Sequence, residues 1–197
     1  MTMMNYHKLV CVWQQVERAY MDERINSERA LQAIMYNALT AALPSDYLVL
    51  VEAGFPSNQE LSKYISDLMV LNRRTKTVEG FFELKCAPHC WLTKNNVRRD
   101  LDKLQAYSGT VGSAMEIDVF GPKRIFDNGV WIGGRPRYLV ANDAIVAFVL
   151  LARRNDMLHR EKLSHAIIAQ QNFMLFSGCT EPGTEEFLVQ VVKVNPK

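Results

Sequence analysis

The chain has few cysteines and no long hydrophobic run. Four cysteines are spread unevenly over 197 residues, unlike the dense and regular framework of a disulfide-stapled secreted domain. The longest apolar stretch, residues 144–152, is too short to cross a bilayer. Residues 1–20 lack the apolar run and small-residue cleavage site of a signal peptide. We therefore expect reduced thiols, no membrane span and a cytoplasmic location.

An excess of one charge is also missing. Lysine and arginine number 23 against 21 aspartates and glutamates, a net charge of +2, so the molecule has no strong overall field. Any contact with nucleic acid must therefore come from a local patch. The hydrophobic fraction of 48% is that of an ordinary globular protein and excludes disorder and collagen-like repeats. The length predicts one domain over residues 1–197.

The hydrophobic pattern predicts an α/β fold. Apolar residues at helical spacing predict helices over residues 8–23, 27–42, 93–109 and 161–173. Short runs rich in β-branched and aromatic residues predict strands over residues 47–53, 65–71, 78–86, 144–153 and 186–194. This order indicates a central mixed sheet flanked by helices.

Two segments stand outside that core. Residues 1–26 form an N-terminal helical extension, and residues 110–143, rich in glycine and proline, form an insertion. Within the insertion, the turn Asp127-Asn128-Gly129 between two apolar triplets predicts a β-hairpin.

Charged residues in two neighbouring predicted strands indicate a site. Side chains alternate along a strand, so Glu83 and Lys85 project from one face while Leu84 points to the core. Asp67 lies in the strand before them. A central strand rarely carries two charges beside a neighbouring carboxylate without a use for them. Two carboxylates on adjacent strands suit Mg²⁺, and a nearby ammonium can position a water molecule or offset the charge of a phosphate.

The sequence over about residues 27–107 resembles the PD-(D/E)XK nucleases, which have the restriction-endonuclease-like fold. Glu28, Asp67 and then Glu83-Leu84-Lys85 occur in the family's order, with suitable elements between them. Ser66 stands where the motif's proline would be, a change that does not alter the metal chemistry. The resemblance implies a restriction-endonuclease-like core, to which the predicted β-hairpin is an insertion.

The resemblance also implies a role for each residue. Asp67 and Glu83, with the Leu84 carbonyl, would bind Mg²⁺ or Mn²⁺, and Lys85 would orient the attacking water. Glu28 would complete the metal site. Gln105 resembles a polar residue that many members carry on the helix after the lysine strand.

Other interpretations of these residues stay open. Glu83 and Lys85 could form an ion pair on an exposed strand face, and Glu28 could be an acid favoured by a helix N-terminus. At helical spacing, however, Glu28 falls at the edge of the apolar stripe, where a carboxylate needs a partner. Glu52, in the first predicted strand, is an alternative acid.

Basic residues offer a path for a phosphate backbone. Lys94 and Arg98 share one flank of the predicted helix with Gln105 and could contact nucleic acid, or they could belong to a solvated face. Basic residues around the hairpin could form an arm for a nucleic-acid groove or simply keep the loop soluble. These are Lys123, Arg124, Arg135 and Arg137.

A short cysteine–histidine segment raises the question of zinc. Cys86, His89 and Cys90 supply three candidate ligands. A closed structural site needs four, and no second pair stands at the usual spacing.

The expected function is therefore that of a divalent-metal-dependent nuclease that hydrolyses phosphodiester bonds, with DNA as the expected partner. This expectation leaves room for a homodimer. The rival is a non-catalytic nucleic-acid- or protein-binding module that keeps the nuclease fold. The presence of all the acidic and lysine positions favours the enzyme.

Overall fold

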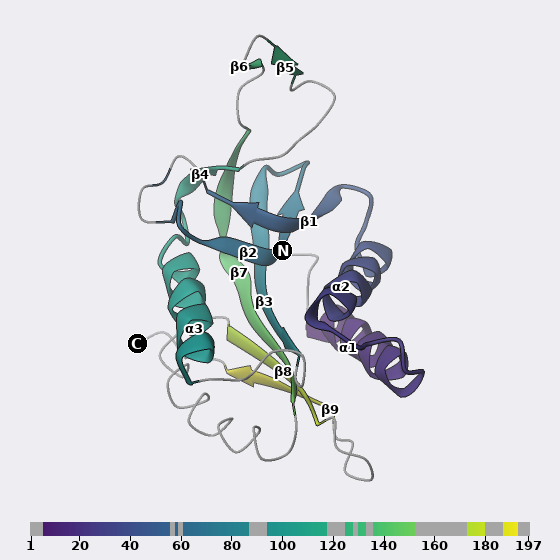
Figure 1. Cartoon of the computed structure of the whole chain (residues 1–197). Coiled ribbons are helices and arrows are strands. Elements are labelled where there is room, and N and C mark those ends of the chain that lie inside the picture. Colours follow the sequence, from purple (N-terminus) through teal and green to yellow (C-terminus); the bar gives the residue numbers. More distant parts are fainter. Residues whose placement is uncertain are drawn as a thin grey trace.

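A computed structural model describes residues 6–55, 58, 61–86, 94–117, 125–127, 130–132, 136–152, 173–179 and 187–192. It confirms the predicted α/β class, since a mixed sheet runs between helices on its two faces (Figure 1). Helices α1 (Tyr6–Met21) and α2 (Glu28–Ala42) cover one face and α3 (Lys94–Ser108) covers the other. No helix in the described part of the chain has the length and apolar character needed to span a membrane.

The central sheet joins antiparallel strands to a parallel centre. Its order along the main path is β1 (Tyr47–Gly54), β2 (Ile65–Asn72), β3 (Thr77–Cys86), β7 (Arg137–Ala152), β8 (Phe173–Cys179) and β9 (Phe187–Val192). The β3–β7 and β7–β8 pairs are parallel and the others are antiparallel. Parallel neighbours need a crossover, and the chain between β3 and β7 contains α3.

Three short strands lie between α3 and β7 in the chain. Strand β4 (Ala114–Glu116) pairs with the start of β7. Strands β5 (Ile125–Asp127) and β6 (Val130–Ile132) form the separate hairpin at the top of Figure 1. The hairpin is the one that the turn sequence predicts.

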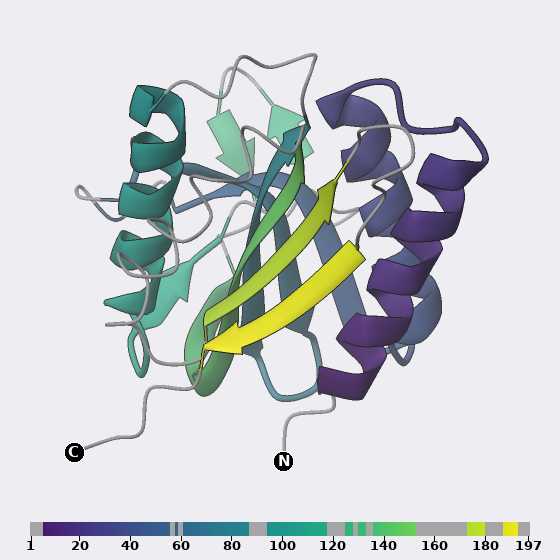
Figure 2. The ribbon, with the colours of Figure 1, turned by 90° about the horizontal axis from the view of Figure 1, so that it is seen from below.

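The alternation of side chains divides the core into two layers. Phe82 and Leu84 of β3 pack with α1 and α2, whereas Phe81 packs with α3. Glu83 and Lys85 have the parity of Phe81, so their side chains leave β3 on the α3 side. Viewed from below, β7, β8 and β9 cross the molecule between α3 and α1 (Figure 2). The face that holds the charges is therefore closed by α3.

Helix α2 begins where its sequence predicts. Ser27 is the N-cap, with an extended backbone, and its Oγ accepts a hydrogen bond from the Ala30 N–H at 3.2 Å. Glu28 follows in the first turn, where the helix dipole favours an acid. The helix ends at Ala42, two residues before Pro44. This start places Glu28 at the end of α2 that meets β2 and β3.

The described structure differs from the expected elements in two places. Strand β8 was not expected; Phe173, the last residue of the predicted helix 161–173, begins it, and residues 161–172 lie outside the described residues. Strand β7 begins at Arg137 rather than at residue 144. The last residues of the predicted insertion therefore belong to the central sheet, where Leu139 and Val140 pair with β3.

Candidate active site

Strands β2 and β3 diverge where the charged residues lie. Their pairing reaches Leu68 and Phe82. Beyond it, Ser66 pairs with β1, and residues 83–86 pair with β7. The Ser66 hydroxyl lies 2.8 Å from the Leu68 carbonyl of its own strand and bridges the opening through the Phe82 carbonyl of β3, at 3.3 Å. Polar side chains can therefore enter the sheet here.

Asp67 holds the two diverging strands together. Its Oδ2 accepts a hydrogen bond of 2.7 Å from the Leu84 N–H, and its own carbonyl accepts one of 2.9 Å from Gln32 of α2. Burial raises the pKa of Asp67, while the Leu84 N–H and the ammonium group of Lys103 oppose the increase. The bond from Leu84 fixes the Asp67 carboxylate beside the backbone that precedes Lys85.

Glu83 is fully buried, with no exposed side-chain surface. Its Oε2 pairs with the ammonium group of Lys103 from α3. Its Oε1 is buried and has no hydrogen-bond partner. Burial and the neighbouring Asp67 carboxylate raise the pKa of Glu83 well above its usual range, against the lowering effect of Lys103. Glu83 is thus a buried carboxylate with one oxygen left for a further cation.

Lys85 joins elements from both faces of the sheet. Its Nζ lies 3.4 Å from Glu28 of α2 and 3.1 Å from Asp100 of α3. It also donates a 3.0 Å hydrogen bond to the Leu84 carbonyl. Burial lowers the pKa of Lys85, but Asp100 and Glu28 outweigh it and hold the pKa above its usual value. Lys85 is therefore an ammonium ion at neutral pH and acts as a hydrogen-bond donor, not as a base.

Two residues of this cluster, Asp100 and Lys103, were missed by the sequence analysis. The Asp100 side chain is 1% exposed and forms ion pairs with Lys85 and Lys103. The two residues lie three positions apart on α3, so they share one face of the helix. Asp100 also lies four residues before the buried Leu104 and seven before the buried Tyr107. That spacing was the signal that could have found it, because it marks the face of α3 that packs on the sheet.

Of the α3 residues proposed from the sequence, the structure describes the side chain of Gln105. Gln105 is exposed, whereas Asp100, Lys103 and Tyr107 lie on the side that meets the cluster. Tyr107 stacks on Phe81 with ring centroids 4.8 Å apart. Burial, and then the carboxylates of Glu83 and Asp67, raise its pKa. The side chains of Lys94 and Arg98 lie outside the described residues.

The remaining sequence candidates that the structure describes lie outside this cluster. Glu52 is exposed on β1 with a φ of 51°. Arg137 is exposed and pairs with Glu116 at 3.2 Å, and Lys123, Arg124 and Arg135 lie outside the described residues. Cys86 is buried at the end of β3. The rest of the cysteine–histidine segment, residues 87–90, lies outside the described residues.

The donor set can be tested against a divalent cation. Within the described parts of the chain, no three acidic, histidine or cysteine side chains are grouped closely enough to enclose a metal ion. Mg²⁺ needs only one or two carboxylates, because it keeps several waters. The cluster has four carboxyl groups and only two ammonium groups. That excess, and the unpartnered Glu83 Oε1, fit a divalent cation at Asp67 and Glu83.

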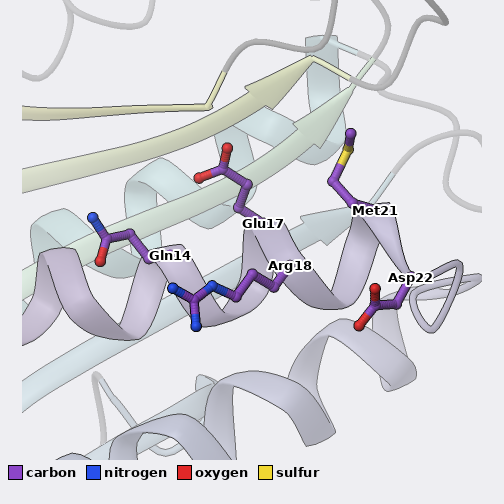
Figure 3. A pocket seen from close by; sticks show the side chains of 5 residues that line it. All are labelled: Gln14, Glu17, Arg18, Met21 and Asp22. Carbon is purple, nitrogen blue, oxygen red and sulfur yellow. The ribbon is translucent and has the colours of Figure 1, made fainter.

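A surface pocket elsewhere does not share these residues. It has a volume of about 430 Å³ and lies over α1 (Figure 3). The described residues that line it are Gln14, Glu17, Arg18, Met21 and Asp22. The charged cluster comes instead from α2, β2, β3 and α3. The pocket is therefore separate from the candidate site.

The comparisons with known proteins give one distant structural likeness. No known family matches the sequence, and no curated protein matches it. Among solved structures, the chain is similar to NucC of P. aeruginosa ATCC27853 in its cAAA-bound form, with a TM-score of 0.49 and 10% identity. The likeness covers 96% of this chain and 85% of that one. At this level it tells us nothing about chemistry, which has to be derived from the cluster itself.

Proposed function

We propose that the protein is a divalent-metal-dependent nuclease that hydrolyses phosphodiester bonds in DNA. The observation that carries the proposal is the meeting of Asp67, Glu83 and Lys85 where β2 and β3 diverge. The structure supports this with two hydrogen-bonded or ion-paired carboxylates beside a lysine that stays charged. A buried strand that carries such charges without use would be costly.

Asp67, Glu83 and the carbonyl of Leu84 are the groups that would hold Mg²⁺ or Mn²⁺. When bound, the ion would activate water and stabilise charge on the phosphate. The chain's own residues do the rest. The Leu84 N–H fixes the Asp67 carboxylate, and Glu28 and Asp100 hold the Lys85 ammonium group from two sides. From that position Lys85 donates a hydrogen bond to the attacking water and offsets the growing negative charge.

The proposal is tested by incubating the purified protein with DNA and RNA substrates. Supercoiled, linear, single-stranded and branched DNA and an RNA are each incubated with Mg²⁺, Mn²⁺ or a chelator. We expect cleavage of DNA with either ion and none with the chelator. Lys85→Met should lower turnover by about 10² to 10⁴, the usual range for a positioned acid–base group, with little change in DNA affinity.

Matched variants exclude a contaminating nuclease. Asp67→Asn removes an expected metal ligand, so a higher Mg²⁺ concentration should partly restore its activity, which it cannot do for Lys85→Met. Lys76→Met makes the same charge change at an exposed position in the turn before β3 and should leave cleavage unchanged. Equal activity of the wild type and Lys85→Met would contradict the proposal. DNA binding in Ca²⁺ with no cleavage under any condition would favour a binding module.

A further inference from the structure

The ammonium group of Lys103 pairs with Glu83, whose carboxylate is a ligand of the proposed metal site. Its Nζ pairs with Glu83 Oε2 and also lies 3.3 Å from the Ile65 carbonyl and 3.4 Å from Asp100 Oδ1. The Lys103 side chain is only 12% exposed. The ammonium group is thus held inside the site by groups from β2, β3 and α3, and it is not a solvated surface charge.

A divalent cation at Glu83 would meet this ammonium group at close range. Glu83 Oε1 is free of hydrogen bonds, but the two oxygens of a carboxylate are about 2.2 Å apart, so both cations would lie within a few ångströms of each other in a buried site. Like charges at that range repel strongly. The two cations therefore compete for Glu83.

The structure also offers a place for the displaced ammonium group. Asp100 is buried, and Lys103 Nζ already lies 3.4 Å from its Oδ1. Neither oxygen of Asp100 has a well-aligned hydrogen bond, although Oδ2 pairs with Lys85 at 3.1 Å. A small conformational change of the Lys103 side chain would move its ammonium group from Glu83 to Asp100. The ammonium group would then stay buried and ion-paired.

We propose that Lys103 is an exchangeable counter-ion, which neutralises Glu83 in the metal-free protein and moves to Asp100 when a divalent cation binds. This inference rests on the proposed function, because it takes Glu83 as a metal ligand. It gives Lys103 two roles. The residue keeps Glu83 from being buried as an unpaired charge, and it sets the concentration of divalent cation at which the site fills.

The test is a direct measurement of Mn²⁺ affinity by titration calorimetry on the full chain, without nucleic acid. Lys103→Met removes the competing cation, so Mn²⁺ should bind more tightly, by about tenfold, the scale on which groups next to a metal ligand change its affinity. Lys103→Gln keeps a hydrogen-bond donor for Glu83 without the charge, and it should also bind Mn²⁺ more tightly than the wild type. It replaces Lys103→Met in the test if that variant folds poorly. Titrations at two pH values separate competition by protons from competition by the ammonium group.

A second variant tests the proposed destination. Asp100→Asn removes the alternative partner of Lys103 and should weaken Mn²⁺ binding, whereas in the Lys103→Met background the same change should have a much smaller effect. Lys76→Met is the matched control for loss of a lysine and should leave the affinity unchanged. Asp67→Asn should reduce binding in every background, which shows that the titrated ion occupies this site.

The outcomes distinguish this inference from the proposed function. If the wild type binds Mn²⁺ through Asp67 but Lys103→Met binds it equally or less tightly, Lys103 is not a competitor, and the metal site stands without it. If neither protein binds Mn²⁺, both the inference and the proposed metal dependence are wrong. If Lys103→Met binds more tightly but DNA is never cleaved, the exchange is supported and the nuclease proposal fails.

Discussion

At the scale of single residues, the candidate site is a chain of alternating charges. Ion pairs link Glu28, Lys85, Asp100, Lys103 and Glu83 in that order, and the three carboxylates come from three different elements. Each ammonium group has two carboxylate partners. Such sharing gives each of these five charges at least one partner of opposite sign, and a buried charge without a partner would be strongly destabilising.

Strand alternation was enough to find part of this chain from the sequence. It placed Glu83 and Lys85 on one face and put Asp67 on the neighbouring strand, and the structure brings these three together. Asp100 and Lys103 were missed because they look like ordinary charges on an amphipathic helix. Their importance depends on which face of α3 packs on the sheet, and that follows from the tertiary structure. Gln105 was proposed from the family resemblance, and the sequence alone did not show that its side chain is exposed.

The raised pKa of Glu83 leads to a prediction about stability. Its pKa lies above the ordinary value of 4.5, so the folded protein holds this proton more tightly than the unfolded chain. Stability is therefore lost as the pH rises from about 4.5 through the folded pKa. With metal removed by a chelator, the wild type should lose stability relative to Glu83→Gln over this range, as measured by urea unfolding at several pH values. Lys103 stays charged throughout, because its own pKa is raised.

The opposite pH dependence of the wild type and Glu83→Gln would contradict this prediction. A wild type that gains stability relative to Glu83→Gln as the pH rises would mean that the pairing with Lys103 outweighs burial and holds the pKa of Glu83 below its usual value. Asp67, whose pKa is also raised, interacts with Glu83, so the two carboxyls should titrate as a pair. The measured difference therefore belongs to both groups.

At the scale of elements, the divergence of β2 from β3 creates the site. Where the ladder stops, α2 supplies Gln32 to the Asp67 carbonyl and Glu28 to Lys85. The sequence predicted these elements to within a few residues, because each has a clear period and clear end signals. It did not predict β8, since all of its residues are buried, and a strand buried on both faces lacks the alternation that marks a half-buried one.

Two elements offer an acid for the third position of the site, and the structure distinguishes them. Glu28 at the start of α2 lies 3.4 Å from Lys85 and has a side chain that is 36% exposed, while Glu52 is exposed on β1. Glu28→Gln should lower the rate of metal-dependent cleavage by about tenfold, as expected for an outer partner of an active-site group. Glu52→Gln should leave the rate unchanged.

Initial rates at saturating Mn²⁺, with melting temperatures measured alongside, provide the check. Because Glu28 is partly exposed, its ion pair should contribute little to stability, so both variants should melt close to the wild type. If Glu52→Gln lost activity and Glu28→Gln did not, the third acid of the site would be Glu52 of β1 and not Glu28.

At the scale of the whole molecule, the sheet separates a layer that supports the fold from the layer that holds most of the site. One hydrophobic cluster lies between the sheet and helices α1 and α2, and the other lies on the α3 side. The sequence predicted helices around a mixed sheet, but it could not assign each helix to a face. That assignment depends on strand order, which joins β3 to β7 across more than fifty residues of sequence.

This division predicts that α1 can be weakened without changing the chemistry. Trp13 of α1 is 2% exposed and contacts the rings of Phe176 in β8 and Phe187 in β9, each at 5.6 Å between centroids. Trp13→Ala should lower the free energy of unfolding by about 3–5 kcal/mol, the cost of truncating a large buried aromatic side chain. Trp13→Phe should cost less, because it keeps a ring and removes a buried indole N–H that has no hydrogen-bond partner.

Urea unfolding gives the stabilities, and Mn²⁺ titration at a temperature where each variant is folded should give the wild-type affinity. A loss of affinity in Trp13→Ala as large as that of Asp67→Asn would show that the two layers are coupled and that the α1 side helps to shape the metal site.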